Sequence, residues 1–184
     1  MDARIRYTKM AIKDAFIQLL SVQPLNKITV TMLCEIAQIN RATFYKYYDD
    51  AFDLMKQIEA ELILDMREMT EQAEITSVDD IFKMIVLKMK DKHDIYTVVC
   101  SENGDSQFVN QVFMLGYQLT LPTLDNRVSS LSSSEKEWFF FFMVKGFAGI
   151  MERWMVNGMP ESPEMVAGFM SRLSKTLLEE YVTD

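Results

Sequence analysis

The sequence predicts an all-α protein, with an N-terminal three-helix head and a C-terminal body of six helices. Glycine and proline, which mark turns and loops, number only six and four in 184 residues. Apolar residues make up 49% of the chain, enough for a substantial core, and no long stretch alternates apolar and polar residues as a strand would. We expect the head to span residues 1–50 and the body residues 51–184.

The first helix is expected over residues 7–21. Its apolar residues share one face, which would pack on the next two helices: Ile12, Ala15, Phe16, Leu19 and Leu20. Pro24 and Asn26 then break the chain before the next element.

Residues 28–48, ITVTMLCEIAQINRATFYKYY, predict two short helices joined by a tight turn. Thr31 is expected to cap the first helix, whose buried face would consist of Met32, Leu33, Ile36 and Ala37. Residues 38–40 form the turn, and Asn40 caps a second helix whose exposed side would carry Arg41, Thr43, Lys46 and Tyr47. This is the plan of a helix-turn-helix, whose second helix enters the major groove of DNA.

A long helix over residues 51–73 is expected to join head and body. Asp49 and Asp50 would cap it, and its inward face would consist of Phe52, Leu54, Met55, Ile58, Leu62 and Met66. Five more helices are expected over residues 78–91, 93–101, 106–129, 136–156 and 163–181. Pro122 should kink or interrupt the helix that contains it, while Ser162 and Pro163 should begin the last one as cap and first helical residue.

The formal net charge of −8 hides two regions of opposite sign. Residues 1–48 hold seven Lys/Arg and three Asp/Glu, a net of +4, whereas residues 49–184 hold twelve and twenty-four, a net of −12. Only the basic end gains by displacing counterions from phosphates, so this polarity would orient the molecule on a polyanion. The sign changes at the end of the helix-turn-helix pattern, which favours a nucleic-acid-binding role over simple solvation.

The sequence argues against catalysis. A carboxylate-bridged two-metal site in a helical body needs Glu-x-x-His pairs, and the chain has a single histidine, His93. His93 would also be the only histidine base for a serine or cysteine nucleophile, and no glycine-rich elbow lies near one. We therefore expect no enzyme activity, no metal and no cofactor.

Cys34 and Cys100 have no metal-ligand spacing around them and lie among apolar neighbours, which predicts reduced core cysteines. The alternative, a redox-sensing thiol, lacks a basic neighbour to lower its pKa. The longest apolar run, residues 138–144, is too short to cross a bilayer, and the N-terminus has no signal-peptide layout. A soluble cytoplasmic protein, associated with the nucleoid when bound to DNA, is expected.

The head carries a resemblance to a known family at Ala11-Ile12, Ala15-Phe16, Leu19-Leu20, Ile28-Thr29-Val30, Ala37 and, most specifically, Thr43-Phe44-Tyr45. Through these positions residues 7–58 resemble the DNA-binding domain of the TetR family of bacterial transcriptional regulators. The body, through residues 101–105, Trp154, Gly158 and residues 161–163, resembles a type found in some Gram-positive members, including relatives of the dihydroxyacetone-kinase operon activator. The resemblance implies nine helices and a two-fold dimer on double-stranded DNA.

The candidate DNA-binding residues lie in and beside the helix-turn-helix. Arg41 is the best candidate for a base contact, because its fork matches the two acceptors of guanine. Ala42 and Thr43 are small enough to let the helix sit deep and can contact a thymine methyl group. By resemblance, the residues that meet bases and phosphates would be Tyr45, Lys46 and Tyr47. The flanking phosphates could accept hydrogen bonds from residues near the start of the first of the two helices, namely Lys27, Thr29 and Thr31. Phe44 should lie in the core, and Tyr48, unlike Tyr47, should be a packed aromatic residue that closes the head.

Two positions depart from the family pattern. Ala51 stands where many members have a lysine that meets a phosphate, and Asp49 and Asp50 precede it. Two carboxylates would repel a phosphate from the amides at this helix start, so we expect weaker or more salt-sensitive binding. Gln38 occupies a turn position where glycine is common, at a cost in backbone strain.

The apolar pattern of the penultimate helix predicts a dimer. Residues 138–151 are apolar almost all round, so this helix needs a second apolar surface in addition to its own core. The candidate interface residues are Phe142, Gly146, Gly149, Arg153, Met165, Gly168, Phe169 and Leu173. A four-helix bundle of the last two helices of each copy would present two heads to a palindromic operator. The alternative is a monomer with one deep core.

By resemblance, a small-molecule effector would enter a cavity in the body and release the DNA. Methionine and phenylalanine, fifteen and twelve in number, suit an adaptable apolar cavity. Candidate pocket residues are Phe82, Met89, Tyr96, Phe113, Tyr117 and Trp154, each of which is also an ordinary core residue by type. The sequence leaves open a repressor, an activator of the same family, or a DNA-bound dimer that acts through a protein partner.

Overall fold

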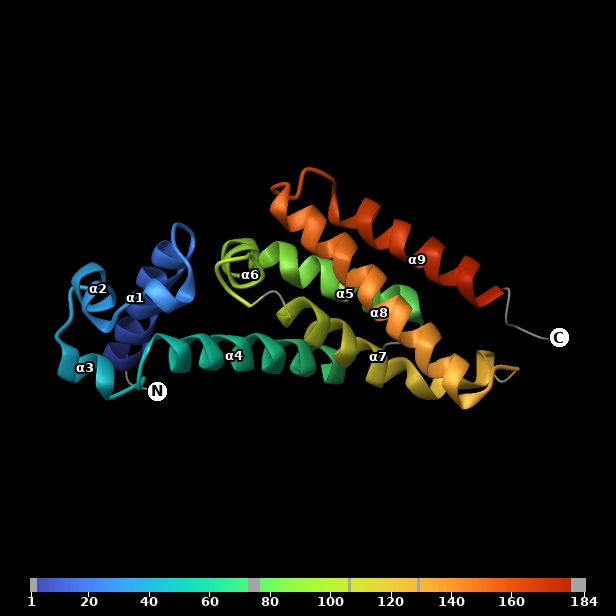
Figure 1. Cartoon of the computed structure of the whole chain (residues 1–184), viewed down its shortest axis with the longest axis horizontal. Helices are drawn as coiled ribbons and strands as arrows, with labels where there is room; N and C mark the ends of the chain where they lie inside the picture. The colour runs from blue at the N-terminus through green and yellow to red at the C-terminus, as the bar shows by residue number, and fades with distance from the viewer. Residues whose placement is uncertain (1–2, 73–76, 106, 129, 180–184) are drawn as a thin grey trace. The chain divides into compact units, whose positions relative to one another are not determined.

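The computed structural model describes residues 3–72, 77–105, 107–128 and 130–179. Over these residues it contains nine α-helices, one 3₁₀ turn and no strand, which confirms the prediction of an all-α fold (Figure 1). The elements are α1 (Ala3–Leu20), η1 (Leu25–Lys27), α2 (Val30–Ile36), α3 (Arg41–Tyr45), α4 (Ala51–Gln72), α5 (Val78–Asp91), α6 (His93–Val99), α7 (Phe108–Arg127), α8 (Ser133–Val156) and α9 (Pro163–Glu179).

Two compact units divide the chain. Unit 1 comprises Met1–Leu64 with Asp94–Ser106, and unit 2 comprises Asp65–His93 with Gln107–Asp184. Unit 1 therefore contains α1 to α3, the first part of α4 and nearly all of α6. No helix in the described part of the chain is long and apolar enough to cross a membrane.

The face of α1 that was predicted to be apolar is buried. All five predicted residues lie in the core of unit 1: Ile12, Ala15, Phe16, Leu19 and Leu20. After α1 the chain contacts the turn that follows α6, because Asn103 Nδ2 donates to Leu20 O at 3.1 Å and Leu25 N donates to Asn103 O at 3.0 Å.

The predicted cap of α2 is wrong by two residues. Thr29, not Thr31, has extended backbone angles and accepts a hydrogen bond from Met32 N at 3.3 Å, so the helix begins at Val30. The buried residues of α2 are Leu33 and Cys34, while Ile36 is 39% exposed and Ala37 is half-buried. A valine just after a threonine cap hides the helix start in the sequence, since Val favours strands.

The start of α4 is capped as predicted. Asp50 Oδ1 accepts a hydrogen bond from Asp53 N at 2.8 Å, and Asp53 Oδ2 accepts one from Asp49 N at 3.0 Å. Its inward residues are buried, namely Leu54, Met55, Ile58, Leu62 and Met66. Phe52 is the exception, because it is 49% exposed.

In unit 2, α5 packs against α9, and α7 packs against α8. Asp79 of α5 receives hydrogen bonds from Ser171 and from Lys175 Nζ (2.7 Å), which lowers the pKa of the Asp79 carboxyl. The helix α7 continues through Pro122, so of the two outcomes predicted there, a kink or an interruption, the interruption does not occur. Ser132 and Glu135 form a capping box at the start of α8, and Ser162 caps α9 as predicted. The predicted end of the last helix at residue 181 lies outside the described residues.

Candidate nucleic-acid interface

A tight turn and a side-chain cap fix the position of α3. Gln38 adopts a φ of 53°, the left-handed conformation expected of this turn. Asn40 has extended backbone angles, and its Oδ1 accepts from Thr43 N at 2.8 Å, which confirms the predicted cap. Phe44 is fully buried, as predicted, and anchors the helix to the core of unit 1.

The helix α3 is only five residues long. Lys46 is its C-cap, and Tyr47 lies in the turn that follows, so the prediction that both residues belong to the helix is wrong. They nevertheless remain beside it, because Tyr47 N and Tyr48 N donate to Phe44 O at 2.9 and 3.1 Å. These two hydrogen bonds hold the turn after α3 against the last residues of the helix.

The outer side of α3 presents a guanidinium group, a small residue and a phenol. Arg41, Ala42 and Tyr45 are exposed, Tyr45 at 54%. Arg41 Nη2 donates to Thr31 Oγ1 at 2.5 Å, so a residue of α2 holds the guanidinium group. Thr43 is half-buried, and its hydroxyl donates to Asn40 Oδ1 at 3.0 Å, which leaves its methyl group as the part that can contact a base.

Cationic side chains surround the Tyr47 ring. The Nζ atoms of Lys9 and Lys46 lie 5.8 and 5.7 Å from the ring centroid, from α1 and from the end of α3. Tyr48, in contrast, is buried, as predicted, and packs on Phe44 with ring centroids 5.7 Å apart. Burial raises the pKa of Tyr48 to about 12.

A groove of about 540 Å³ runs between the start of α1 and α3. It is lined by Arg4, Ile5, Thr8, Gln38, Ile39, Asn40, Thr43, Lys46 and Tyr47. The sequence interpretation missed the α1 residues Arg4 and Thr8, and also Lys9. A signal was present, because the basic residues 4, 6, 9 and 13 recur at nearly helical spacing, and only the fold shows which of them lie beside α3. Lys13 does not, since it pairs with Glu61 of α4.

The remaining DNA-binding candidates lie at helix ends. Lys27 is exposed at the end of η1, and Thr29 is exposed as the cap of α2. Ala51, the position where the family pattern has lysine, is only 3% exposed. At this start of α4, amide groups already donate to the carboxylates of Asp50 and Asp53, which leaves fewer donors for a phosphate.

The candidate dimer residues lie along the outer side of α8 and α9 in unit 2. Five of them line one groove of about 660 Å³, namely Gly146, Gly149, Arg153, Met165 and Phe169. Phe142 is 60% exposed, while Gly168 and Leu173 are half-buried beside them. The sequence interpretation missed Trp138 and Phe141, which are 68% and 62% exposed on α8. They are large apolar residues that the core of unit 2 does not cover.

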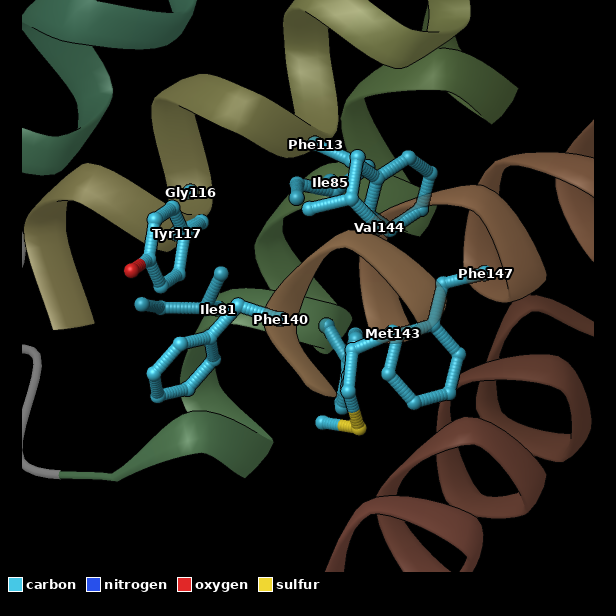
Figure 2. A pocket seen from close by; sticks show the side chains of 10 residues that line it. Ile81, Ile85, Phe113, Gly116, Tyr117, Phe140, Met143, Val144 and Phe147 are labelled. Atoms are coloured by element: carbon cyan, nitrogen blue, oxygen red, sulfur yellow. The ribbon is translucent and has the colours of Figure 1, made fainter. Parts of the chain in front are cut away.

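The candidate effector residues do not share one site. Phe82, Phe113 and Tyr117 line a partly open cavity between α5, α7 and α8 (Figure 2). Met89 is buried elsewhere in the core of unit 2, and Tyr96 is buried in unit 1. Trp154 lines the outer groove, where its Nε1 donates to Glu161 O at 3.2 Å. Apolar type alone did not separate cavity residues from core residues.

Comparisons with known proteins agree with this architecture. The family model TetR_C_8, described as "Transcriptional regulator C-terminal region", matches residues 76–176. No match was found among curated protein sequences.

Two solved structures are similar along nearly the whole chain. One is the "Dihydroxyacetone kinase operon activator DhaS", with a TM-score of 0.62 and 18% identity over 96% of this chain and 98% of that one. The other is the fatty acid degradation regulator FadR from Bacillus halodurans, with a TM-score of 0.59 and 13% identity over 93% and 94%. At these identities the likeness concerns the fold.

Proposed function

The chain belongs to the TetR family of transcriptional regulators, and from this premise we propose that it binds a palindromic operator as a homodimer and represses transcription until an effector releases it. That it is a DNA-binding transcriptional regulator follows from the family. The single observation that carries the mode of binding is the exposed side of α3, where Arg41, Ala42 and Tyr45 project from a helix anchored by Phe44.

In the proposed complex, α3 enters the major groove and Arg41 reads a guanine through two hydrogen bonds. The hydrogen bond to Thr31 already restricts the Arg41 side chain before DNA binds. Arg41 therefore loses less conformational entropy on binding. Ala42, the Thr43 methyl group and Tyr45 contact neighbouring base edges. These contacts set the sequence preference.

Phosphate contacts in this proposal come from the rim of α3. Lys46 and Tyr47 lie at its C-terminal end, with Lys9 close to the same ring. Further donors for a flanking phosphate lie at the end of η1 and at the start of α2, namely Lys27, Thr29 and Thr31. Such contacts fix the register of the protein on DNA and carry no base preference.

Dimerisation in this proposal buries the outer side of α8 and α9. A stable interface buries about 1,200–2,000 Å² and places aromatic residues and methionine at its centre. Trp138, Phe141, Phe142, Met165 and Phe169 provide such residues, each at least 45% exposed in the single chain. At Gly146 and Gly149 an added Cβ would meet nothing within 4 Å, so space for a partner helix is open there.

Selection of bound sequences from a random duplex pool tests the proposal most directly. We expect a palindrome with two half-sites on one face of the duplex, because two-fold symmetry of the protein imposes it. A bound sequence without internal symmetry would contradict the dimeric mode of binding.

Two variants then separate base contacts from phosphate contacts on the selected operator. Arg41→Ala should cost about 1–3 kcal/mol and relax the preference at one position of each half-site. Lys46→Ala should weaken all duplexes alike and reduce the slope of affinity against salt by about one counterion per half-site. If Arg41→Ala bound operator and random duplex as the parent does, Arg41 would not be the base-reading residue.

Activation is the second candidate, favoured by the likeness of the whole chain to an operon activator. A reporter gene placed behind the selected operator distinguishes the two. Repression predicts higher expression when the regulator is deleted, and activation predicts lower expression.

A further inference from the structure

The partly open cavity between α5, α7 and α8 in unit 2 is lined almost entirely by carbon. Its walls are formed by Ile81, Phe82, Ile85, Phe113, Gly116, Tyr117, Phe140, Met143, Val144 and Phe147 (Figure 2). The Tyr117 hydroxyl is the one side-chain oxygen or nitrogen among these lining residues, and in Figure 2 it lies at the left edge of the group of labelled side chains. The walls that a ligand would contact are therefore hydrocarbon, except at the edge near Tyr117, although the cavity is partly open to solvent.

The lining selects against charge. Taking an ionised carboxylate or ammonium group out of water costs many kcal/mol unless a partner of opposite charge receives it. None of the lining residues is acidic or basic, so no such partner is present in the cavity wall. An uncharged apolar ligand loses nothing comparable and gains by leaving water.

The size of the cavity selects for a slim ligand. Its volume is about 40 Å³, whereas an engineered apolar cavity of about 150 Å³ accepts benzene. A single alkyl chain is narrower than an aromatic ring, but the space as it stands is too small for a chain of several carbons, so such a chain can enter only as the walls move apart. Met143 is suited to such movement, because a methionine side chain is unbranched and has three rotatable bonds.

Gly116 maintains the remaining space. A Cβ atom added there would lie 3.2 Å from Ile81 Cγ2 and 3.3 Å from Ile85 Cδ1, tighter than ordinary contact. Both neighbours are themselves cavity walls, so any side chain at position 116 would push into the cavity or displace them. Glycine in the middle of α7 otherwise costs helix stability, about 1 kcal/mol relative to alanine.

We propose that the effector of this regulator is an uncharged molecule with a slim, unbranched alkyl chain, which occupies the cavity between α5, α7 and α8, where Gly116 leaves room for it. The inference rests on the proposed control by an effector, and it adds the chemical class of that effector. A weakly polar group at one end of the chain would lie near the Tyr117 hydroxyl.

Four probes of known chemistry test the proposal on the full-length protein without DNA. They are 1-decanol (uncharged and slim), decanoate (anionic), decyltrimethylammonium (cationic) and 1-adamantanemethanol (uncharged and bulky), each measured by calorimetry below its aggregation concentration. We expect 1-decanol to bind at least about ten-fold more tightly than the other three, because only it meets both requirements of the cavity. Equal binding of the charged probes, stronger binding of the bulky probe, or no binding of 1-decanol would overturn the inference.

Three variants locate the binding. Gly116→Ala should weaken 1-decanol binding about ten-fold, since it narrows the cavity. Met143→Ala should widen the cavity and admit 1-adamantanemethanol. Met114→Ala is its matched control, because Met114 lies on α7 outside the cavity and is 40% exposed, and it should leave all four affinities unchanged. If Gly116→Ala failed to fold, the Met143 and Met114 pair would still decide the location, and identical behaviour of that pair would place the ligand elsewhere.

Operator binding is measured separately in the presence of 1-decanol. Release of the operator supports both the ligand class and control by an effector. Tight 1-decanol binding that leaves operator binding unchanged supports the ligand class and contradicts the proposed relief of repression. The failure of either proposal is thus visible without the other.

Discussion

At the scale of single residues, Gln38 concentrates backbone strain in the turn of the helix-turn-helix. Its φ of 53° disfavours any residue with a Cβ atom by about 1–2 kcal/mol. Glycine removes this strain, although its greater freedom in the unfolded chain offsets about 0.5–1 kcal/mol. We therefore expect Gln38→Gly to stabilise the protein by about 0.5–1 kcal/mol in urea unfolding.

The matched control for this change is Gln118→Gly on α7. Gln118 is exposed within a regular helix, where glycine destabilises by about 1 kcal/mol. Opposite signs for the two variants would attribute the stabilisation to the backbone conformation of residue 38. A loss of stability in both would contradict that explanation.

Asp49 places an uncompensated carboxylate at the start of α4, on the side where a phosphate is expected. Its backbone amide donates to Asp53, but its exposed side chain is not needed for the cap that Asp50 provides. Asp49→Asn should therefore tighten DNA binding by roughly two- to five-fold at low salt, with the gain fading as salt rises. Fluorescence anisotropy over a salt series measures this, and a gain that does not depend on salt would contradict an electrostatic cause.

At the scale of elements, α4 contacts the turn after α6 through a pair of acidic residues within unit 1. Glu59 Oε1 is buried without a hydrogen-bond partner. Burial, the charge of Asp105 and a hydrogen bond with Asp105 raise the pKa of Glu59 to about 7, although Lys56 lowers it. The turn itself is held in place, since Asp105 N donates to Val99 O at 2.7 Å.

Because the pKa of Glu59 is higher in the folded protein than its ordinary value of 4.5, the folded state holds this proton more strongly than the unfolded chain does. The resulting contribution to stability is complete below pH 4.5 and is lost as the pH rises through about 7. We expect the Tm of the parent to fall between pH 5.5 and pH 8, and Glu59→Gln to flatten this fall by a few degrees. Identical pH profiles for parent and variant would show that the Glu59 carboxyl does not titrate in this range.

Most helices were predictable because their signals are local. Asn40, Asp50 and Ser162 cap helices by hydrogen bonds that span three residues, and the buried faces of α1 and α4 follow the period of the helix. Two of the errors have tertiary causes. The exposure of Ile36 and that of Phe52 depend on neighbours that are distant in the sequence.

The candidate site was predictable to a similar degree. Arg41 and Tyr45 could be placed on an exposed surface from the cap and the buried Phe44, since one turn of helix fixes their directions. Arg4 and Lys9 could not, because only the packing of α1 brings them to α3. The cavity residues were predicted only in part. Gly116 has no side chain whose type could indicate a cavity, and its role depends on how closely Ile81 approaches it in the fold.

At the scale of the whole molecule, the charge distribution has a consequence for DNA binding. Residues 1–48 carry +4 and residues 49–184 carry −12, so two copies would bring +8 to the operator and −24 elsewhere. The acidic remainder disfavours any orientation except heads toward DNA, and it also opposes the close approach of two copies. Apolar burial has to overcome this repulsion for a dimer to form.

The exposed side of α8 is therefore where dimerisation can be tested. Phe141 and Phe142 are 62% and 60% exposed, and replacing both with glutamate would place two more acids on a surface that has to lose water. We expect the Phe141→Glu, Phe142→Glu variant to sediment as a folded monomer while the parent sediments as a dimer. Leu87→Glu is the matched control, since Leu87 is 49% exposed on α5 and lies outside the proposed interface.

Loss of the dimer should weaken binding to the palindromic operator, because a dimer contacts both half-sites at once. A monomer engages one half-site at a time, so the double variant should lose the avidity gained from joining two heads, about 10²–10⁴-fold on the palindrome, while its affinity for a single half-site stays that of the parent. Leu87→Glu should keep both affinities. A double variant that remained dimeric, or that became monomeric without weaker binding to the palindrome, would show that α8 does not join the two heads on the operator.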